Sequence, residues 1–91
     1  MYQIESASSR IKRELRRIPR PDRGRITEAV QALADDPHPP GVVPLEQDVY
    51  RLRVDDHYLI YKVLDQERII LIGRMVWRSE STYRDLRRLF E

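Results

Sequence analysis

Cysteine is absent from the sequence, and the only two histidines, His38 and His57, lie far apart along the chain. Without cysteine, disulfide bonds and thiolate metal sites are excluded, and the separation of the histidines argues against a histidine-based metal site. No apolar run reaches the length of a membrane-spanning helix, and residues 1–5 lack the charged and apolar regions of a signal peptide. We therefore expect a cytoplasmic protein without a metal, a cofactor or a membrane contact.

Lysine is also scarce, because only Lys12 and Lys62 are lysines among the 17 cationic residues. The bias towards arginine can reflect genomic base composition alone, but arginine also suits the bidentate recognition of phosphate. The net charge is only +2, yet between positions 10 and 25 eight cationic residues stand against Glu14 and Asp22. This local excess of positive charge indicates a polyanionic partner.

The first half of the chain predicts a short strand and two helices within a single domain of 91 residues. Alternation over residues 2–5 predicts the strand, Ser8 or Ser9 can cap the first helix, and Pro19 and Pro21 end it. The inward-facing residues are Tyr2 and Ile4 in the strand, Ile11, Leu15 and Ile18 in the first helix, and Ile26, Ala29, Val30 and Leu33 in the second. Because the link is short, we expect the helices to pack as an antiparallel hairpin.

The second half predicts strands and a last helix. Residues 37–44 contain four prolines and predict an irregular crossing loop, in which His38 is a solvated residue rather than a catalytic one. Residues 50–64 predict two strands joined by a turn at Asp55 and Asp56, and residues 68–77 predict an internal strand covered on both faces. Ser79 or Ser81 can cap a final helix, whose apolar stripe would be Tyr83, Leu86, Leu89 and Phe90.

Alternation divides the central hairpin into an apolar face and a mixed face. The apolar face receives Tyr50, Leu52, Val54, Leu59, Tyr61 and Val63, and the mixed face receives Arg51, Arg53, Tyr58, Ile60 and Lys62. Charge on a strand face often serves only solubility and protection from edge pairing. The alternative is that Arg51 and Arg53 form part of a binding or catalytic surface.

The order of these elements resembles the RelE/ParE family of toxins from bacterial toxin-antitoxin modules, over nearly the whole chain. The segments that carry the resemblance are residues 2–4, 33–37, 49–54, 58–61, 77–78 and 83–84. The elements and the resemblance together predict an α+β, RelE-like fold over residues 1–91. We expect an antiparallel-dominated sheet of four strands, in the order β-α-α-β-β-β-α, with the N-terminal helical hairpin on one face and a short C-terminal helix.

The resemblance implies an inhibitor of growth that a partner antitoxin neutralises. The RelE-like branch cuts messenger RNA on the ribosome without a metal, using the ribose 2′-hydroxyl as the nucleophile, whereas the ParE-like branch poisons DNA gyrase. The residues that match the RelE-like catalytic positions are Arg51, Arg53, Arg78 and Tyr83. They favour an endoribonuclease, with a non-catalytic gyrase inhibitor as the alternative and a basic nucleic-acid-binding module that has lost toxicity as a third interpretation.

Physical chemistry supports arginines in such a site. In-line attack by a 2′-hydroxyl passes through a phosphorane with extra negative charge, which preorganised guanidiniums stabilise. Arginine is a poor general base. The resemblance does not supply another base, because this sequence has Tyr58 where many relatives carry arginine and Trp77 where some relatives carry histidine. His57 is a candidate base, although alternation points it away from Arg51 and Arg53.

A wider set of basic and aromatic residues is predicted to bind RNA. Its members are Tyr58, Lys62, Arg74, Trp77, Arg13, Arg16, Arg17 and Arg20. The expected partners are the ribosome, messenger RNA and a RelB-like antitoxin segment that is disordered when alone and docks an amphipathic helix or a strand against the sheet and the helical hairpin.

Overall fold

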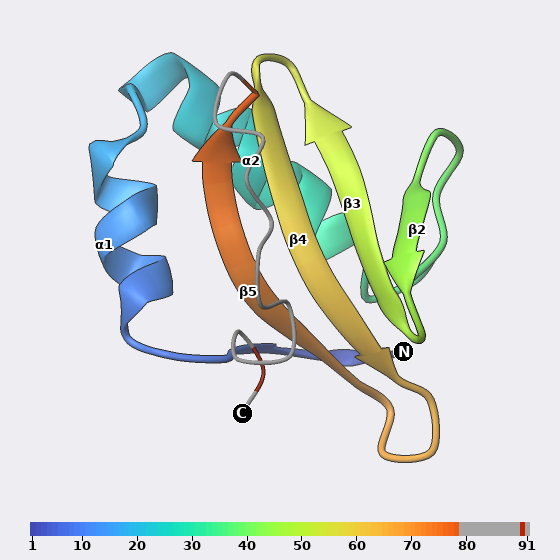
Figure 1. The fold of residues 1–91 in the computed structure, drawn as a ribbon. Coiled ribbons are helices and arrows are strands. Elements are labelled where there is room, and N and C mark those ends of the chain that lie inside the picture. Colours follow the sequence, from blue (N-terminus) through green and yellow to red (C-terminus); the bar gives the residue numbers. More distant parts are fainter. Residues whose placement is uncertain (79–89, 91) are drawn as a thin grey trace.

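The computed structural model describes residues 1–78 and residue 90, so Tyr83 and the predicted last helix lie outside the described residues. The elements are β1 (Gln3–Ser6), α1 (Arg10–Arg17), α2 (Arg20–Ala32), β2 (Val43–Glu46), β3 (Val49–Val54), β4 (His57–Leu64) and β5 (Ile69–Trp77). The strands form one sheet in the order β1-β5-β4-β3-β2, in which only the β1–β5 pair is parallel (Figure 1). The predicted α+β class with an antiparallel-dominated sheet is confirmed.

The described sheet has five strands instead of the predicted four, because part of the proline-bearing segment is a strand. Residues 37–42 are irregular as expected, but β2 pairs with β3 through Val43 opposite Arg51 and Pro44 opposite Tyr50. Proline is compatible with a strand at the edge of a sheet, because the side of the strand that lacks the N–H faces no neighbouring strand and no hydrogen bond of the sheet is lost. A register shift between Pro44 and Glu46 then leads into β3.

The central hairpin is confirmed in extent and in facing. Strands β3 and β4 pair with Tyr50 opposite Tyr61 and Leu52 opposite Leu59, and the two-residue turn contains Asp55 at a φ of 54°. Short carboxylate side chains tolerate this left-handed conformation better than most residues, which explains an aspartate there.

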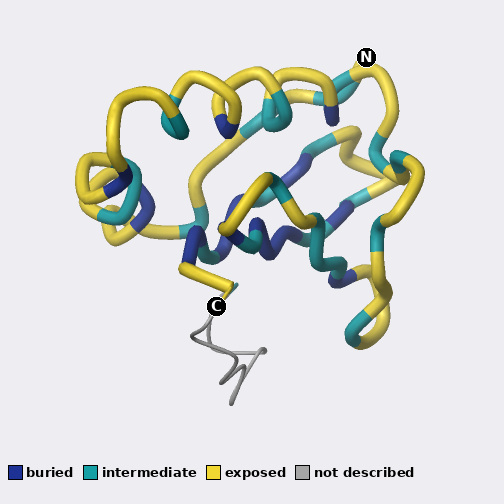
Figure 2. The backbone as a smooth tube through the Cα atoms, turned by 90° about the horizontal axis from the view of Figure 1, so that it is seen from above, coloured by how far each residue is buried: buried dark blue, intermediate teal, exposed yellow. Residues whose placement is uncertain are grey.

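Both helices pack on the apolar face of the sheet, α1 against β5 and α2 against β3. They meet at an angle, since in Figure 2 α1 is seen nearly end-on while α2 runs across the view. The Arg23 guanidinium stabilises the sharp link by donating hydrogen bonds to the carbonyls of Arg16 (2.9 Å) and Ile18 (3.0 Å), which the end of α1 leaves open. Ser9 is the N-cap residue of α1, but its side chain makes no capping hydrogen bond.

The core lies between the helices and this face of the sheet. Its buried residues are Ile11, Ile18, Ile26, Leu33, Leu59, Tyr61, Val63, Ile70, Ile72 and Met75, with Tyr2, Ile4, Leu15 and Val30 among those packed around it. The inward positions predicted in the first strand and the two helices therefore belong to the core, apart from Ala29, which is partly buried. The opposite face of the sheet, called the outer face below, carries the charged residues of the hairpin.

Candidate functional site

The outer face brings the hairpin arginines into two adjacent rows across the sheet. Strand pairing places Arg51, Ile60 and Arg74 in one row. The next row towards the β3–β4 turn contains Arg53, Tyr58 and Val76. This arrangement follows directly from alternation along β3 and β4, and it puts both predicted catalytic arginines of β3 on one surface.

Arg51 and Arg53 are held differently. The Arg51 guanidinium lies over the Tyr58 ring, 4.5 Å from its centroid, so that a cation–π contact orients it. Arg53 is exposed, and its Nε donates a hydrogen bond of 3.0 Å to the carbonyl of Asp55 in the turn. The turn is tied in addition to α2 by an ion pair of 2.9 Å between Arg25 and Asp55, and this contact raises the pKa of Arg25.

Arg78 joins this surface from the end of β5. Its backbone N–H donates a hydrogen bond of 2.7 Å to the carbonyl of Asp56, which places it beside the β3–β4 turn. Arg78 is exposed and directly follows the end of β5, close to the turn that Arg53 precedes. Three of the four predicted catalytic residues thus lie at one end of one face, and the fourth, Tyr83, is outside the described residues.

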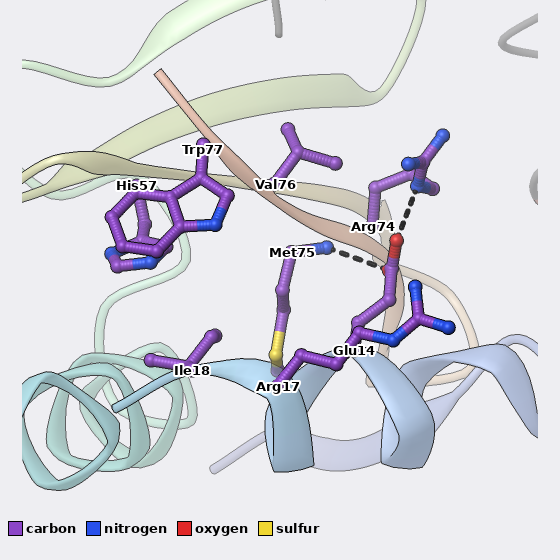
Figure 3. Close-up of a pocket in the computed structure, with 8 residues that line it drawn as sticks. All are labelled: Glu14, Arg17, Ile18, His57, Arg74, Met75, Val76 and Trp77. Atoms are coloured by element: carbon purple, nitrogen blue, oxygen red, sulfur yellow. Dashed lines mark hydrogen bonds and ion pairs between the residues drawn. The ribbon is translucent and has the colours of Figure 1, made fainter. Parts of the chain in front are cut away.

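Arg74, predicted to bind RNA, is engaged by a carboxylate. Its Nε lies 2.8 Å from Oε2 of Glu14, and only 27% of the arginine side chain and 12% of the glutamate side chain are exposed. Oε1 of the same Glu14 accepts the backbone N–H of Met75 at 3.0 Å (Figure 3). Among the described residues, β1 pairs with β5 only as far as Ile72. Beyond that point the Glu14 carboxylate accepts a hydrogen bond from the open edge of β5, and in this sense it caps the strand.

Removing this carboxylate should destabilise the fold. We expect Glu14→Ala to lower the free energy of unfolding by about 1–3 kcal/mol, because a poorly accessible N–H and a half-buried guanidinium lose their partner. Denaturant unfolding would measure the change. Glu67→Ala, at an exposed turn position, is the matched control and should stay within about 0.5 kcal/mol; equal effects would show that Glu14 is not a structural cap.

The remaining predicted RNA-binding residues lie in two separate regions. Tyr58 and Lys62 lie on the outer face, where Lys62 is opposite Val49 and Leu71. Four further residues are exposed on α1 and at the start of α2, and they are Arg13, Arg16, Arg17 and Arg20. Trp77 is opposite His57 on β4, on the face that carries the helices.

His57 lies away from the arginines of the outer face. Only 1% of it is exposed, and its ring packs on Trp77 with the centroids 4.1 Å apart. Within residues 1–78 and 90, neither ring nitrogen has a hydrogen-bond partner. His57 therefore lies on the face of the sheet opposite to Arg51 and Arg53, so this geometry does not support it as a base for chemistry at those arginines. His38 is an exposed loop residue in edge contact with Tyr50.

Two features of the site escaped prediction from the sequence. The capping role of Glu14 depends on the packing of α1 along β5, although Glu14 is the single acidic residue of α1 and thus stands out in the basic run. The stack of His57 on Trp77 depends on the pairing of β4 with β5.

Among the described residues, no three histidines, aspartates or glutamates come together as a metal site, and no helix there is long and apolar enough to cross a membrane.

Comparisons with known proteins agree with this architecture. The model of the ParE toxins of type II toxin-antitoxin systems, parDE, matches residues 5–82. The archaeal RelE of a RelE-RelB complex from Pyrococcus horikoshii has a TM-score of 0.75 at 22% identity, over 88% of this chain and 98% of that chain. Isolated RelE from E. coli has a TM-score of 0.74 at 17% identity, over 98% and 99% of the two chains.

A metal-bound toxin from Helicobacter pylori has a TM-score of 0.72 at 24% identity, over 90% of this chain and 100% of that chain. Among curated proteins, none matches the sequence. The structural likenesses show the fold, and the family model spans most of the chain. The chain therefore belongs to the family of ParE toxins of type II toxin-antitoxin systems, within the wider RelE/ParE group that its fold shares.

Proposed function

We propose that this toxin inhibits translation by cutting messenger RNA on the ribosome, in the cytoplasm, with the scissile phosphate held at the outer face. The observation that supports the proposal is the convergence of Arg51, Arg53 and Arg78 at one end of that face. Three guanidiniums on a rigid sheet provide preorganised positive charge where a phosphorane would develop its negative charge.

The chemistry assigned to this chain is electrostatic. The 2′-hydroxyl of the substrate attacks the adjacent phosphorus and gives its proton to water, and the 5′-oxygen leaves and takes a proton from water. The products are a 2′,3′-cyclic phosphate and a 5′-hydroxyl, and the proposed step requires no metal or cofactor. Arg51 is oriented by Tyr58, whose ring also offers a surface on which a base can stack. Tyr83 is proposed to assist from the C-terminal segment. The proposal assigns no general base among the arginines.

The partner of a type II toxin is its antitoxin, and several structures of this fold are complexes of RelE with RelB. We propose that a RelB-like antitoxin segment, disordered when alone, docks on the sheet and the helical face. Ile11 on α1 is only 3% exposed and belongs to the core, so a substitution there would not report on this contact. Val43, which is 38% exposed on the edge strand β2, is a better position.

Substitution at that edge gives a direct test. Val43→Glu should weaken antitoxin binding at least about tenfold, because a charge would be placed in an apolar contact. The affinity of the purified toxin for the antitoxin peptide, measured by calorimetry, checks this expectation. Gln47→Glu, at an exposed position beyond the same strand, carries the same charge change as a control. Unchanged binding of both variants would place the antitoxin elsewhere.

Inhibition of DNA gyrase is the second candidate. It is favoured by the family model that matches, which describes ParE toxins, and by the burial of His57 away from the outer face. In that case the arginines of the outer face would bind a protein or DNA surface without cutting RNA.

Induction of the toxin in cells distinguishes the two candidates. Primer extension on abundant messages should reveal cuts at positions phased with codons within minutes, and the cuts should disappear when translation is blocked beforehand. A DNA-damage response without messenger RNA cuts would overturn the ribonuclease proposal in favour of gyrase. Ribosomes themselves need magnesium, so chelation cannot test whether the toxin requires a metal.

A further inference from the structure

A groove runs between α1 and the edge of β5, and of the outer-face row that contains Arg51 it includes only Arg74. It is a hollow of about 250 Å³, called the α1–β5 groove here, and it is lined by Arg10, Arg13, Glu14, Arg17 and Arg74. Four guanidiniums thus surround one carboxylate. That carboxylate already receives Arg74 and the N–H of Met75, so the arginines of α1 give the groove an excess of positive charge.

The arginines of α1 follow one another along the groove. Arg10, Arg13 and Arg17 are exposed and recur at a spacing that places them on one face of a helix. With a rise of about 1.5 Å per residue they span roughly 10 Å of α1. A row of cations over this length matches a few consecutive phosphates of an extended strand.

The groove continues into a second hollow that has an aromatic wall. This cavity of about 150 Å³ shares Glu14, Arg17 and Arg74 with the groove and adds His57 and Trp77 (Figure 3). Trp77 is 41% exposed although it is a large aromatic residue. One side of its indole rests on the buried His57 ring, which holds the indole in place as a platform for stacking.

His57 gives an independent indication of a ligand. It lines the smaller cavity while both of its ring nitrogens are buried and, in the described part of the chain, without a hydrogen-bond partner. Unsatisfied buried polar groups are rare in folded proteins and call for an explanation. A hydrogen-bonding group that enters the cavity beside Trp77 would satisfy one of these nitrogens.

We infer that the α1–β5 groove binds single-stranded nucleic acid, with one base stacked on Trp77 and the phosphates along Arg17, Arg13 and Arg10. A basic groove combined with an aromatic platform is the usual arrangement for binding single strands irrespective of sequence. The inference goes beyond the proposed function, because it involves none of Arg51, Arg53 and Arg78 and holds for either target of the toxin. An acidic peptide would match the charge but would leave the platform unused.

The chain contains a single tryptophan, so indole fluorescence reports directly on Trp77. A short 2′-O-methyl oligouridylate, which cannot be cut through a 2′-hydroxyl, should quench this fluorescence on titration into the full-length toxin. Polyphosphate should bind without comparable quenching, because it has no bases. The same titration on Glu67→Ala, at an exposed turn position that lines neither hollow, should give the wild-type affinity.

Substitutions distinguish stacking from charge. Trp77→Ala should weaken binding of a labelled oligouridylate about 5- to 100-fold by anisotropy. Arg13→Gln and Arg17→Gln should each reduce the slope of log affinity against log salt by about 0.7. Lys12→Gln removes one charge from another part of α1, lines neither hollow, and should change the affinity by less than about twofold.

The outcomes decide the inference in either direction. Absence of quenching by the oligouridylate, or equal effects of Arg13→Gln, Arg17→Gln and Lys12→Gln, would overturn it. Tighter binding of polyglutamate than of the oligouridylate would assign the groove to an acidic protein instead. Circular dichroism shows whether Trp77→Ala folds. If it does not, Trp77→Phe takes its place, because phenylalanine retains an aromatic platform and should bind within about threefold of the wild type. The two arginine variants then decide whether the groove binds the oligouridylate.

Discussion

Replacing Arg51 or Arg78 by alanine is expected to abolish growth arrest and to leave a folded protein. Each change removes a guanidinium from the end of the outer face where charge would develop on the scissile phosphate, and the loss of one preorganised donor commonly costs about 10²–10³ in rate. Single-turnover cleavage of messenger RNA on saturating ribosomes measures the chemical step, and growth after induction measures its consequence.

Stability should change little in these variants. Arg78 is exposed, and its contact with Asp56 is made by the backbone N–H, which alanine retains. Arg51 loses its contact with the Tyr58 ring, for which we expect about 0.5–1 kcal/mol. Thermal melting and antitoxin binding would verify that both variants fold.

Arg16→Ala is the control for general electrostatic attraction. Arg16 is exposed on α1, so its removal should weaken association with ribosomal RNA and make the salt dependence shallower without changing the rate at saturation. Cleavage at the wild-type rate by Arg51→Ala and Arg78→Ala would remove the catalytic assignment, and the gyrase alternative would then gain support.

The outer face was predictable because it depends on the period of two residues in a strand. Once residues 50–64 are recognised as a hairpin with a two-residue turn, the facing of Arg51, Arg53 and Tyr58 follows without further information. The observed register, with Arg53 opposite Tyr58, is the one that this turn enforces. Local patterns therefore determine this part of the site.

Features that depend on distant pairing could not be predicted in this way. β2 was hidden because Pro44 is unfavourable in a strand unless the strand lies at an edge, and the edge is defined only by the order of the whole sheet. Glu14 reads as one charge in a basic helix until α1 is placed along β5. Trp77 and Arg78 are neighbours in sequence, but only the pairing of β4 with β5 shows that Trp77 packs on the buried His57. Arg78, in contrast, is exposed beside the β3–β4 turn.

A second large effect is expected in the core, where Tyr61→Ala should destabilise the toxin by about 3–5 kcal/mol. Tyr61 is fully buried in the central strand β4, and its ring centroid lies 5.8 Å from that of Tyr50. Because domains of this size are stable by only about 5–15 kcal/mol, this variant should melt roughly 10 °C or more below the wild type. It should lose toxicity by unfolding, whereas Arg51→Ala should lose toxicity while folded.

Tyr61→Phe separates the packing of the ring from its hydroxyl group, which donates a hydrogen bond of 2.7 Å to the carbonyl of Pro37. Loss of this bond should cost about 0.5–1.5 kcal/mol at neutral pH. Burial raises the pKa of Tyr61 well above its usual value near 10, so the folded protein keeps the proton in alkaline solution while the unfolded chain releases it.

This difference in proton binding gives the hydroxyl a characteristic dependence on pH. The stability that Tyr61 confers relative to phenylalanine should be constant below about pH 10. It should shrink as the pH rises further, because ionisation then stabilises only the unfolded chain. Denaturant unfolding of both proteins between neutral and strongly alkaline pH measures the gap. A gap that stays constant across this range, or widens with pH, would contradict the burial of a protonated hydroxyl beneath the proline-bearing loop.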